Sequence, residues 1–139
     1  MYIINDINHL LILVRLFKVH ELLPAESLAI SRMKMQQYNV ITNQQLAPHT
    51  QIVRLNIDDV ELFENWRAGK GRHLSGADLS TIYIAVKNPQ LTILLSAEDL
   101  FLPDMCNQCG ARYKQWGELI KEIADERMIQ MYELFKKAS

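Results

Sequence analysis

Short apolar runs alternate along the chain with longer amphipathic segments. The apolar runs predict strands at 2–5, 28–30, 51–55 and 91–96, and residues 112–116 predict a last edge strand. Between them, apolar residues recur at helical spacing. Strands that alternate with helices predict a parallel sheet covered on both faces. The expected fold is therefore a three-layer α/β/α sandwich with a central, mainly parallel sheet of about four or five strands.

The helix boundaries are predicted from capping residues and helix breakers. Asn8 and Ser75 are expected to be N-caps, because their side chains accept hydrogen bonds from the first turn. Pro24 is expected to end the first helix, since proline lacks the N–H that a helix interior needs. The predicted helices span about 9–23, 32–43, 58–69, 74–86, 103–110 and 117–137.

The composition is that of one folded domain. The chain has 139 residues, of which 49% are hydrophobic and 22% charged, so a single domain over 1–139 is expected. A formal net charge of −1 gives no global basic signature for nucleic acid, although a local basic patch remains compatible with it. No secretory signal or bilayer-length apolar run is apparent, so we expect no membrane association and a cytoplasmic protein.

Carboxylates stand at the ends of the predicted strands. Asp6 follows the first strand, Glu98 and Asp99 follow the 91–96 strand, and Asp78 lies in the first turn of the preceding helix. In a parallel sheet the carboxyl ends of the strands share one edge, so these side chains are expected to meet there. Oxygen ligands of this kind suit Mg²⁺ or Mn²⁺. All four acids are therefore candidate metal ligands.

Three motifs occur in order along nearly the whole chain. They are hydrophobic-Asp-x-Asn over 4–8, Leu-Ser-x-Ala-Asp over 74–78, and a buried strand ending Leu-Leu-Ser-Ala-Glu over 94–98. In this order the chain resembles a PIN domain, the small metal-dependent nuclease fold of many bacterial toxin–antitoxin ribonucleases. The resemblance implies a hydrolase that cleaves RNA phosphodiester bonds, with Mg²⁺ or Mn²⁺ as cofactor. It also implies RNA as substrate, a homodimer and a small antitoxin-like inhibitory partner. The implied catalytic metal ligands are Asp6, Asp78 and Glu98.

The chain departs from the PIN pattern at two places. The family usually carries an acid in the helix after the second strand, whereas residues 33–39 contain none, and Gln37 is assigned to that position. The family prefers Asp where Glu98 stands, and Thr where Ser96 stands. These departures lead to an alternative hypothesis: a catalytically eroded PIN-like module that binds RNA or protein.

A further alternative is an unrelated doubly wound α/β domain. The absence of a G-x-G-x-x-G or phosphate-loop motif counts against a nucleotide cofactor in such a domain.

Several polar residues are candidates for supporting roles. Asn8, Ser75 and Ser96 lie next to the candidate ligands. A basic cluster that includes Arg67, Lys70 and Arg72 precedes Asp78. A role in holding an RNA phosphate is one interpretation, and a solvated loop is the favoured one.

Cys106 and Cys109 form a C-x-x-C pair. A tetrahedral zinc site would need two further ligands, and no matching motif supplies them. We therefore favour a packing role over a metal or redox role.

Overall fold

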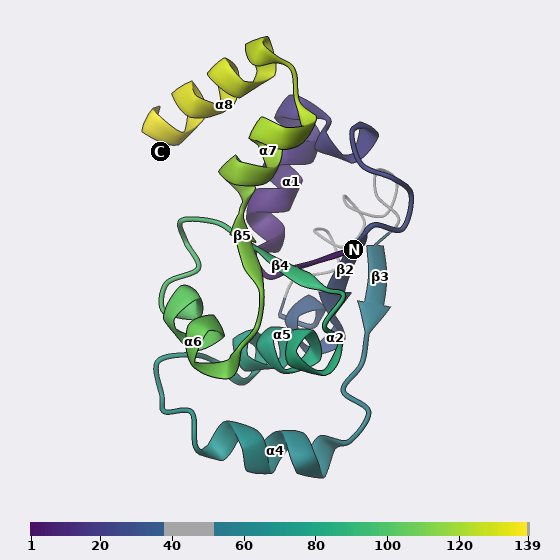
Figure 1. The fold of residues 1–139 in the computed structure, drawn as a ribbon, viewed down its shortest axis with the longest axis vertical. Helices are drawn as coiled ribbons and strands as arrows, with labels where there is room; N and C mark the ends of the chain where they lie inside the picture. The colour runs from purple at the N-terminus through teal and green to yellow at the C-terminus, as the bar shows by residue number, and fades with distance from the viewer. Residues whose placement is uncertain (38–51, 139) are drawn as a thin grey trace.

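A five-stranded parallel sheet forms the centre of the computed structural model, which describes residues 1–37 and 52–138 (Figure 1). Its strands lie in the order β3-β2-β1-β4-β5, and every neighbouring pair is parallel. This architecture confirms the predicted α/β/α sandwich. The strands are β1 (Tyr2–Ile4), β2 (Leu28–Ser31), β3 (Ile52–Leu55), β4 (Thr92–Leu95) and β5 (Tyr113–Gln115).

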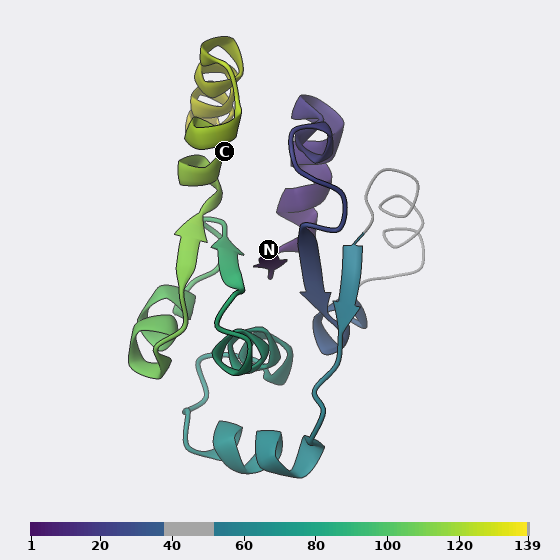
Figure 2. The ribbon, with the colours of Figure 1, turned by 45° about the vertical axis from the view of Figure 1, so that its right-hand side comes forward.

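Helices cover both faces of the sheet. Helices α1 and α7 lie beside each other at one end of the molecule, whereas α4, α5 and α6 lie at the other end (Figures 1 and 2). Within the described ranges, no helix is both long and apolar enough to cross a membrane. The helices are α1 (Ile7–Phe17), the 3₁₀ helix η1 (Val19–Glu21), α2 (Arg32–Met35), α4 (Val60–Ala68), α5 (Gly76–Lys87), α6 (Leu102–Cys109), α7 (Trp116–Ile123) and α8 (Glu126–Ala138).

Consecutive strand residues divide the core into two clusters. In β1, Ile3 packs into the cluster of α4, α5 and α6, whereas Ile4 packs into the cluster of α1, α7 and α8. Ile93 and Leu94 divide in the same way in β4. Successive side chains of a strand point to opposite faces, so a sheet covered on both sides needs apolar residues at almost every position. This requirement explains the continuous apolar runs in the sequence.

The C-terminal helical segment is two helices, so the prediction of one helix over 117–137 is wrong. Helix α7 ends at Ile123, and α8 begins at Glu126. The Asp125 carboxylate accepts a hydrogen bond of 2.8 Å from the backbone N–H of Met128. This contact caps the first turn of α8. Local capping therefore interrupts a sequence pattern that is continuous.

The first helix is capped by Asp6 and not by Asn8. The Asp6 carboxylate accepts a hydrogen bond of 3.1 Å from the backbone N–H of His9, and α1 begins at Ile7. The helix ends at Phe17, because Lys18 adopts the left-handed conformation with φ of 50°. The predicted end near residue 23 is thus wrong.

The second predicted helix, over 32–43, is present only in part. Helix α2 spans Arg32–Met35, and its N-cap Ser31 accepts a hydrogen bond from the backbone N–H of Lys34. The prediction from residue 38 onward lies outside the described residues.

Gly110 ends α6 in the left-handed conformation, with φ of +76°. Replacing it with alanine should lower the free energy of unfolding by about 1–2 kcal/mol, because a Cβ is disfavoured in this region of φ/ψ space. Gly69 is the matched control, since it ends α4 at φ of −90° and, apart from the neighbouring backbone, an added Cβ would meet no atom of the described residues within 4 Å. Urea denaturation of Gly110→Ala and Gly69→Ala measures both changes. Equal losses in the two variants would contradict the conformational explanation.

Candidate functional site

A cleft of about 470 Å³ opens at the carboxyl edge of the sheet. The chain builds the sheet from β1 outward to β3 and then crosses to β4 on the other side of β1. Adjacent parallel strands whose connections run in opposite directions leave a crevice between their carboxyl ends. The segments that follow β1 and β4 supply most of the cleft. Its lining residues are Asp6, Asn8, Lys34, His73, Leu74, Asp78, Glu98, Asp99, Leu100, Phe101 and Leu102.

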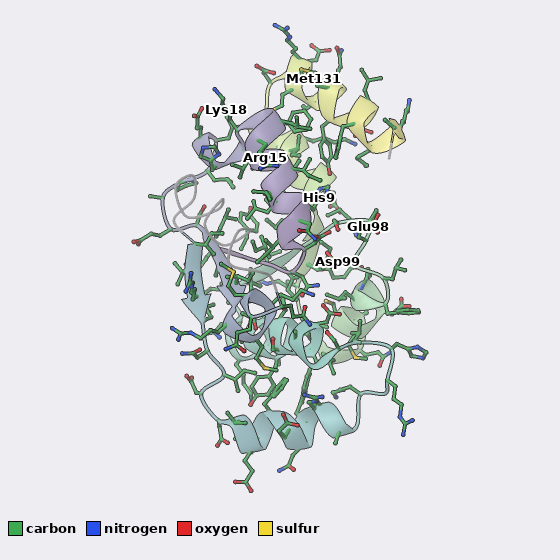
Figure 3. All side chains as sticks on the ribbon, turned by 180° about the vertical axis from the view of Figure 1, so that it is seen from behind. His9, Arg15, Lys18, Glu98, Asp99 and Met131 are labelled. Atoms are coloured by element: carbon green, nitrogen blue, oxygen red, sulfur yellow. The ribbon has the colours of Figure 1, made fainter. Side chains whose placement is uncertain are left out.

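All four predicted acids line this one cleft. Figure 3 shows Glu98 and Asp99 near the N-terminal end of α1, which Asp6 caps. The two acids after β4 differ in environment, because Asp99 is buried whereas Glu98 is exposed. The buried carboxylate after β4 is therefore Asp99. The resemblance to PIN domains instead implies Glu98 as the catalytic ligand of this segment.

Asn5 lies at the centre of the acid cluster and is 1% exposed. Its amide nitrogen donates hydrogen bonds to Asp78 Oδ1 at 3.0 Å and to Asp99 Oδ1 at 2.7 Å. Its amide oxygen accepts a bond of 2.9 Å from the Thr81 hydroxyl. One side chain thus joins the end of β1 to α5 and to the segment after β4. Such fully paired buried amides hold their neighbours in a defined geometry.

Lys34 contributes a buried ammonium to the same cluster. Its Nζ lies 2.5 Å from Asp78 Oδ1, and the two side chains are only 11% and 20% exposed. The position of α2 is fixed by the Ser31 hydroxyl, which lies 2.5 Å from the Ser80 hydroxyl of α5. The hydroxyl contact ties α2 to α5. Lys34 therefore reaches Asp78 from an anchored helix.

Ser96 organises the remaining carboxylates. Its hydroxyl donates a hydrogen bond of 2.8 Å to Asp6 Oδ2, and its backbone N–H donates one of 2.8 Å to Asp99 Oδ2. The same hydroxyl accepts a bond from the backbone N–H of Glu98. Ser96 thus bonds to the carboxylates of both Asp6 and Asp99.

Two of the cluster's acids have shifted pKa values, in opposite directions. Burial tends to raise the pKa of Asp78, but hydrogen bonds from Lys34 and Asn5 outweigh burial and hold it below its ordinary value. Burial raises the pKa of Asp99, and the nearby Asp6 charge adds to that rise. Among the groups that lower the pKa of Asp78, the Lys34 ammonium has the largest effect, and it favours the ionised form of this carboxyl.

His9 connects the edge of the cleft to the C-terminal helix. Burial lowers its pKa, against the influence of Asp6 and Glu98. Its Nε2 lies 3.3 Å from the Tyr132 hydroxyl of α8, and its ring packs near Trp116 and Phe135. Figure 3 shows His9 of α1 close to Glu98. Helix α8 is thus held near the site through an aromatic cluster.

Several predicted support residues lie outside the cleft lining. Gln37 is exposed and is not part of it, so the α2 residue that reaches the acids is Lys34. Ser75 caps α5 by accepting a hydrogen bond of 3.1 Å from the backbone N–H of Asp78.

The basic cluster before α5 is likewise not part of the lining. Arg67 packs over the Phe63 ring and against Gly76, and Lys70 lies over the Trp66 ring. Arg72 is exposed. Arg67 is thus placed beside the first turn of α5.

The C-x-x-C pair has the environment of a packing element. Cys106 is fully buried in the core beside α5, and Cys109 is half-buried. Burial raises the pKa of Cys106 to about 12. A thiol with such a pKa is protonated at neutral pH and is a poor nucleophile.

A divalent metal ion bound to these carboxylates would compete with their hydrogen bonds and with the Lys34 ammonium. Asp78 Oδ1 already accepts from two nitrogens, and both oxygens of Asp6 and of Asp99 accept hydrogen bonds. Unit charges 4 Å apart repel by about 4 kcal/mol at an effective dielectric constant of 20, and a dication roughly doubles this figure. A dication on Asp78 would face that repulsion from Lys34. Across residues 1–37 and 52–138, no group of three or more His, Cys, Asp or Glu side chains has a geometry that could hold a metal ion.

Sequence reasoning identified the acids but missed Asn5 and Lys34. Asn5 directly follows a buried strand, which is a signal for a residue at the sheet edge. Lys34 stands between two methionines in a short helix directly after β2. A lysine in such an apolar setting is a signal for a buried ion pair.

No protein-family model, curated protein or solved structure matches this chain significantly. The observed class is therefore an α/β/α sandwich with an acidic cleft at the carboxyl edge of a parallel sheet.

Proposed function

We propose that this protein is a PIN-like binding module that holds its acidic cleft without a metal and takes up a basic segment of a protein partner. The observation that carries the proposal is the ion pair between Lys34 and Asp78, with Asn5 hydrogen-bonded to the same carboxylate. An acid that is paired within the chain does not need a metal to balance its charge. The PIN resemblance supplies the expectation of a small protein partner.

The charge and the rim of the cleft support a basic occupant. Four carboxylates and one ammonium line it, which gives a net charge of −3 with His73 neutral. Without a metal this charge repels phosphate and attracts lysine or arginine. At the rim, Leu100 and Phe101 are 66% and 53% exposed, and His73 stacks on the Phe101 ring with centroids 5.0 Å apart. An apolar rim around an acidic floor suits a segment that carries both basic and apolar side chains.

Fluorescence anisotropy in EDTA tests this proposal. A labelled peptide of lysine, arginine and leucine should bind, more weakly at higher salt, whereas a labelled single-stranded RNA should not. Glu98→Gln should weaken peptide binding about two- to fivefold, because an exposed charge contributes up to about 1 kcal/mol. Glu98 is the best acid to replace, since its side chain makes no hydrogen bond within the described network.

Glu61→Gln is the matched control, because Glu61 is an exposed acid of α4 outside the cleft. It should leave the affinity for the peptide unchanged. Equal weakening by both variants would point to non-specific attraction and would contradict binding in the cleft.

The metal-dependent ribonuclease that the resemblance implies is the second candidate function. One observation favours it, namely that Asp6, Asp78, Glu98 and Asp99 line a single cleft. It requires Lys34 to leave Asp78. Incubation of the protein with single-stranded RNA and Mn²⁺, beside Asp78→Asn, tests it. Cleavage that disappears in the variant would establish the ribonuclease and overturn the binding module.

A further inference from the structure

Lys34 is an unusual group to find inside an acidic cleft. Its side chain is 11% exposed, and its ammonium contacts Asp78 at 2.5 Å. Lysine is rarely buried to this degree unless an anion pairs with it. A solvent-facing rotamer would spare it the loss of hydration, so its inward position indicates that the acids hold it there.

The contacts around the Lys34 ammonium centre on the Asp78 carboxylate. Asp78 Oδ1 accepts hydrogen bonds from both Lys34 and Asn5, and Asn5 also bonds to Asp99. The Lys34 ammonium and the Asn5 amide thus share one oxygen of Asp78, and the same amide also reaches Asp99. The Ser31–Ser80 contact fixes α2 against α5, so Lys34 is delivered to this place by the fold.

We infer that the Lys34 ammonium is a built-in cation that takes the place of a divalent metal among the carboxylates of the cleft. The chain thereby excludes metal ions from its own acidic site. This inference deepens the proposed function. It rests on that function, because both require a cleft that works without a metal ion. It assigns a role to Lys34 that the partner-binding experiment does not measure.

Mn²⁺ titration by calorimetry tests the inference, with the wild-type protein beside Lys34→Gln and Lys34→Glu. Removing the ammonium should raise the affinity for Mn²⁺ at least about tenfold in Lys34→Gln, and more in Lys34→Glu, which also adds an oxygen ligand. Wild-type affinity equal to that of Lys34→Gln would overturn the inference. Wild-type binding that Asp78→Asn abolishes would also overturn it.

Lys87 supplies the matched controls, because it is an exposed lysine at the C-terminal end of α5, outside the cleft. Lys87→Gln and Lys87→Glu change the net charge equally and should leave Mn²⁺ affinity at the wild-type value. A gain like that of the Lys34 variants would mean that total charge governs the affinity, and would overturn the inference.

Thermal unfolding with and without Mn²⁺ keeps the inference testable if Lys34→Glu does not fold in the absence of metal. A carboxylate in place of Lys34 repels Asp78, so the variant should melt lower than wild type and regain stability when Mn²⁺ is added. Lys34→Gln keeps an N–H donor for Asp78 and provides a second folded test protein. If the peptide does not bind, only the proposed protein partner is contradicted. If replacing Lys34 leaves the Mn²⁺ affinity unchanged, only the present inference is contradicted.

Discussion

Asp78→Ala is expected to lower the free energy of unfolding by about 3–5 kcal/mol, the usual effect of removing one partner of a buried ion pair. Lys34 would then keep a buried ammonium without its nearest anion, and Asn5 would lose one of its two acceptors. The unpaired Lys34 ammonium that remains buried accounts for more of this loss than the missing attraction between Lys34 and Asp78 does. Urea denaturation at pH 7 measures it.

A second substitution separates this explanation from a simple packing defect. In the double variant Asp78→Ala/Lys34→Met, no charge is left buried, so most of the lost stability should return. Losses that simply add in the double variant would show that the two side chains do not interact. Glu64→Gln is the surface control, because it removes an exposed ion pair. Glu64 lies 3.5 Å from Arg67, and the two side chains are 53% and 37% exposed, respectively. Exposed pairs contribute about 0–1 kcal/mol.

The pH dependence of the Asp78 effect follows from the direction of its pKa. The pKa of folded Asp78 lies below its ordinary value, and an unfolded aspartate titrates near about 3.9. Such a group stabilises the fold above the unfolded pKa, and this contribution is lost as the pH falls through the folded pKa. The stability difference between wild type and Asp78→Asn should therefore be full at pH 7 and shrink below about pH 4. A difference that grows toward acid pH would contradict the ion pair.

The sheet was predictable because its signal is local. Residues such as Ile3 and Ile4 must both be apolar when helices cover both faces, so each strand appears as a continuous apolar run. Helix ends were less predictable, since they depend on single hydrogen bonds. Asp125 divides the C-terminal segment through one cap, and Asp6 replaces Asn8 as the cap of α1.

The site was predictable to the extent that topology alone gathers it. Strand ends of a parallel sheet meet at one edge, so Asp6 and Asp99 could be placed together from their order in the chain. The roles of Asn5 and Lys34 could not, because they depend on side-chain direction and on the short helix α2. A lysine reaches the acids only because Ser31 and Ser80 hold α2 against α5. The sequence therefore predicts where the acidic side chains gather. The packing of α2 against α5 determines which cation pairs with them.

Asn5→Asp tests the centre of the network. The substitution keeps the shape of the side chain but replaces two donated hydrogen bonds with a carboxylate that faces Asp78 and Asp99. Hydrogen bonds to charged groups contribute about 1.5–3 kcal/mol each, so we expect a loss of about 3 kcal/mol or more in the free energy of unfolding at pH 7. Chemical denaturation against wild type gives the value.

The Asn5→Asp loss should depend on pH in the sense opposite to that of Asp78. A buried carboxyl among like charges has a raised pKa, so the folded variant retains a proton that the unfolded chain releases. Its stability relative to wild type should fall as the pH rises above about 4. Asn65→Asp is the matched control, because Asn65 is an exposed residue of α4 outside the cleft lining. Equal stability of Asn5→Asp and Asn65→Asp across this pH range would mean that Asn5 does not hold the acids together. A selective loss in Asn5→Asp would instead identify its amide as the donor that keeps Asp78 and Asp99 side by side without a metal ion.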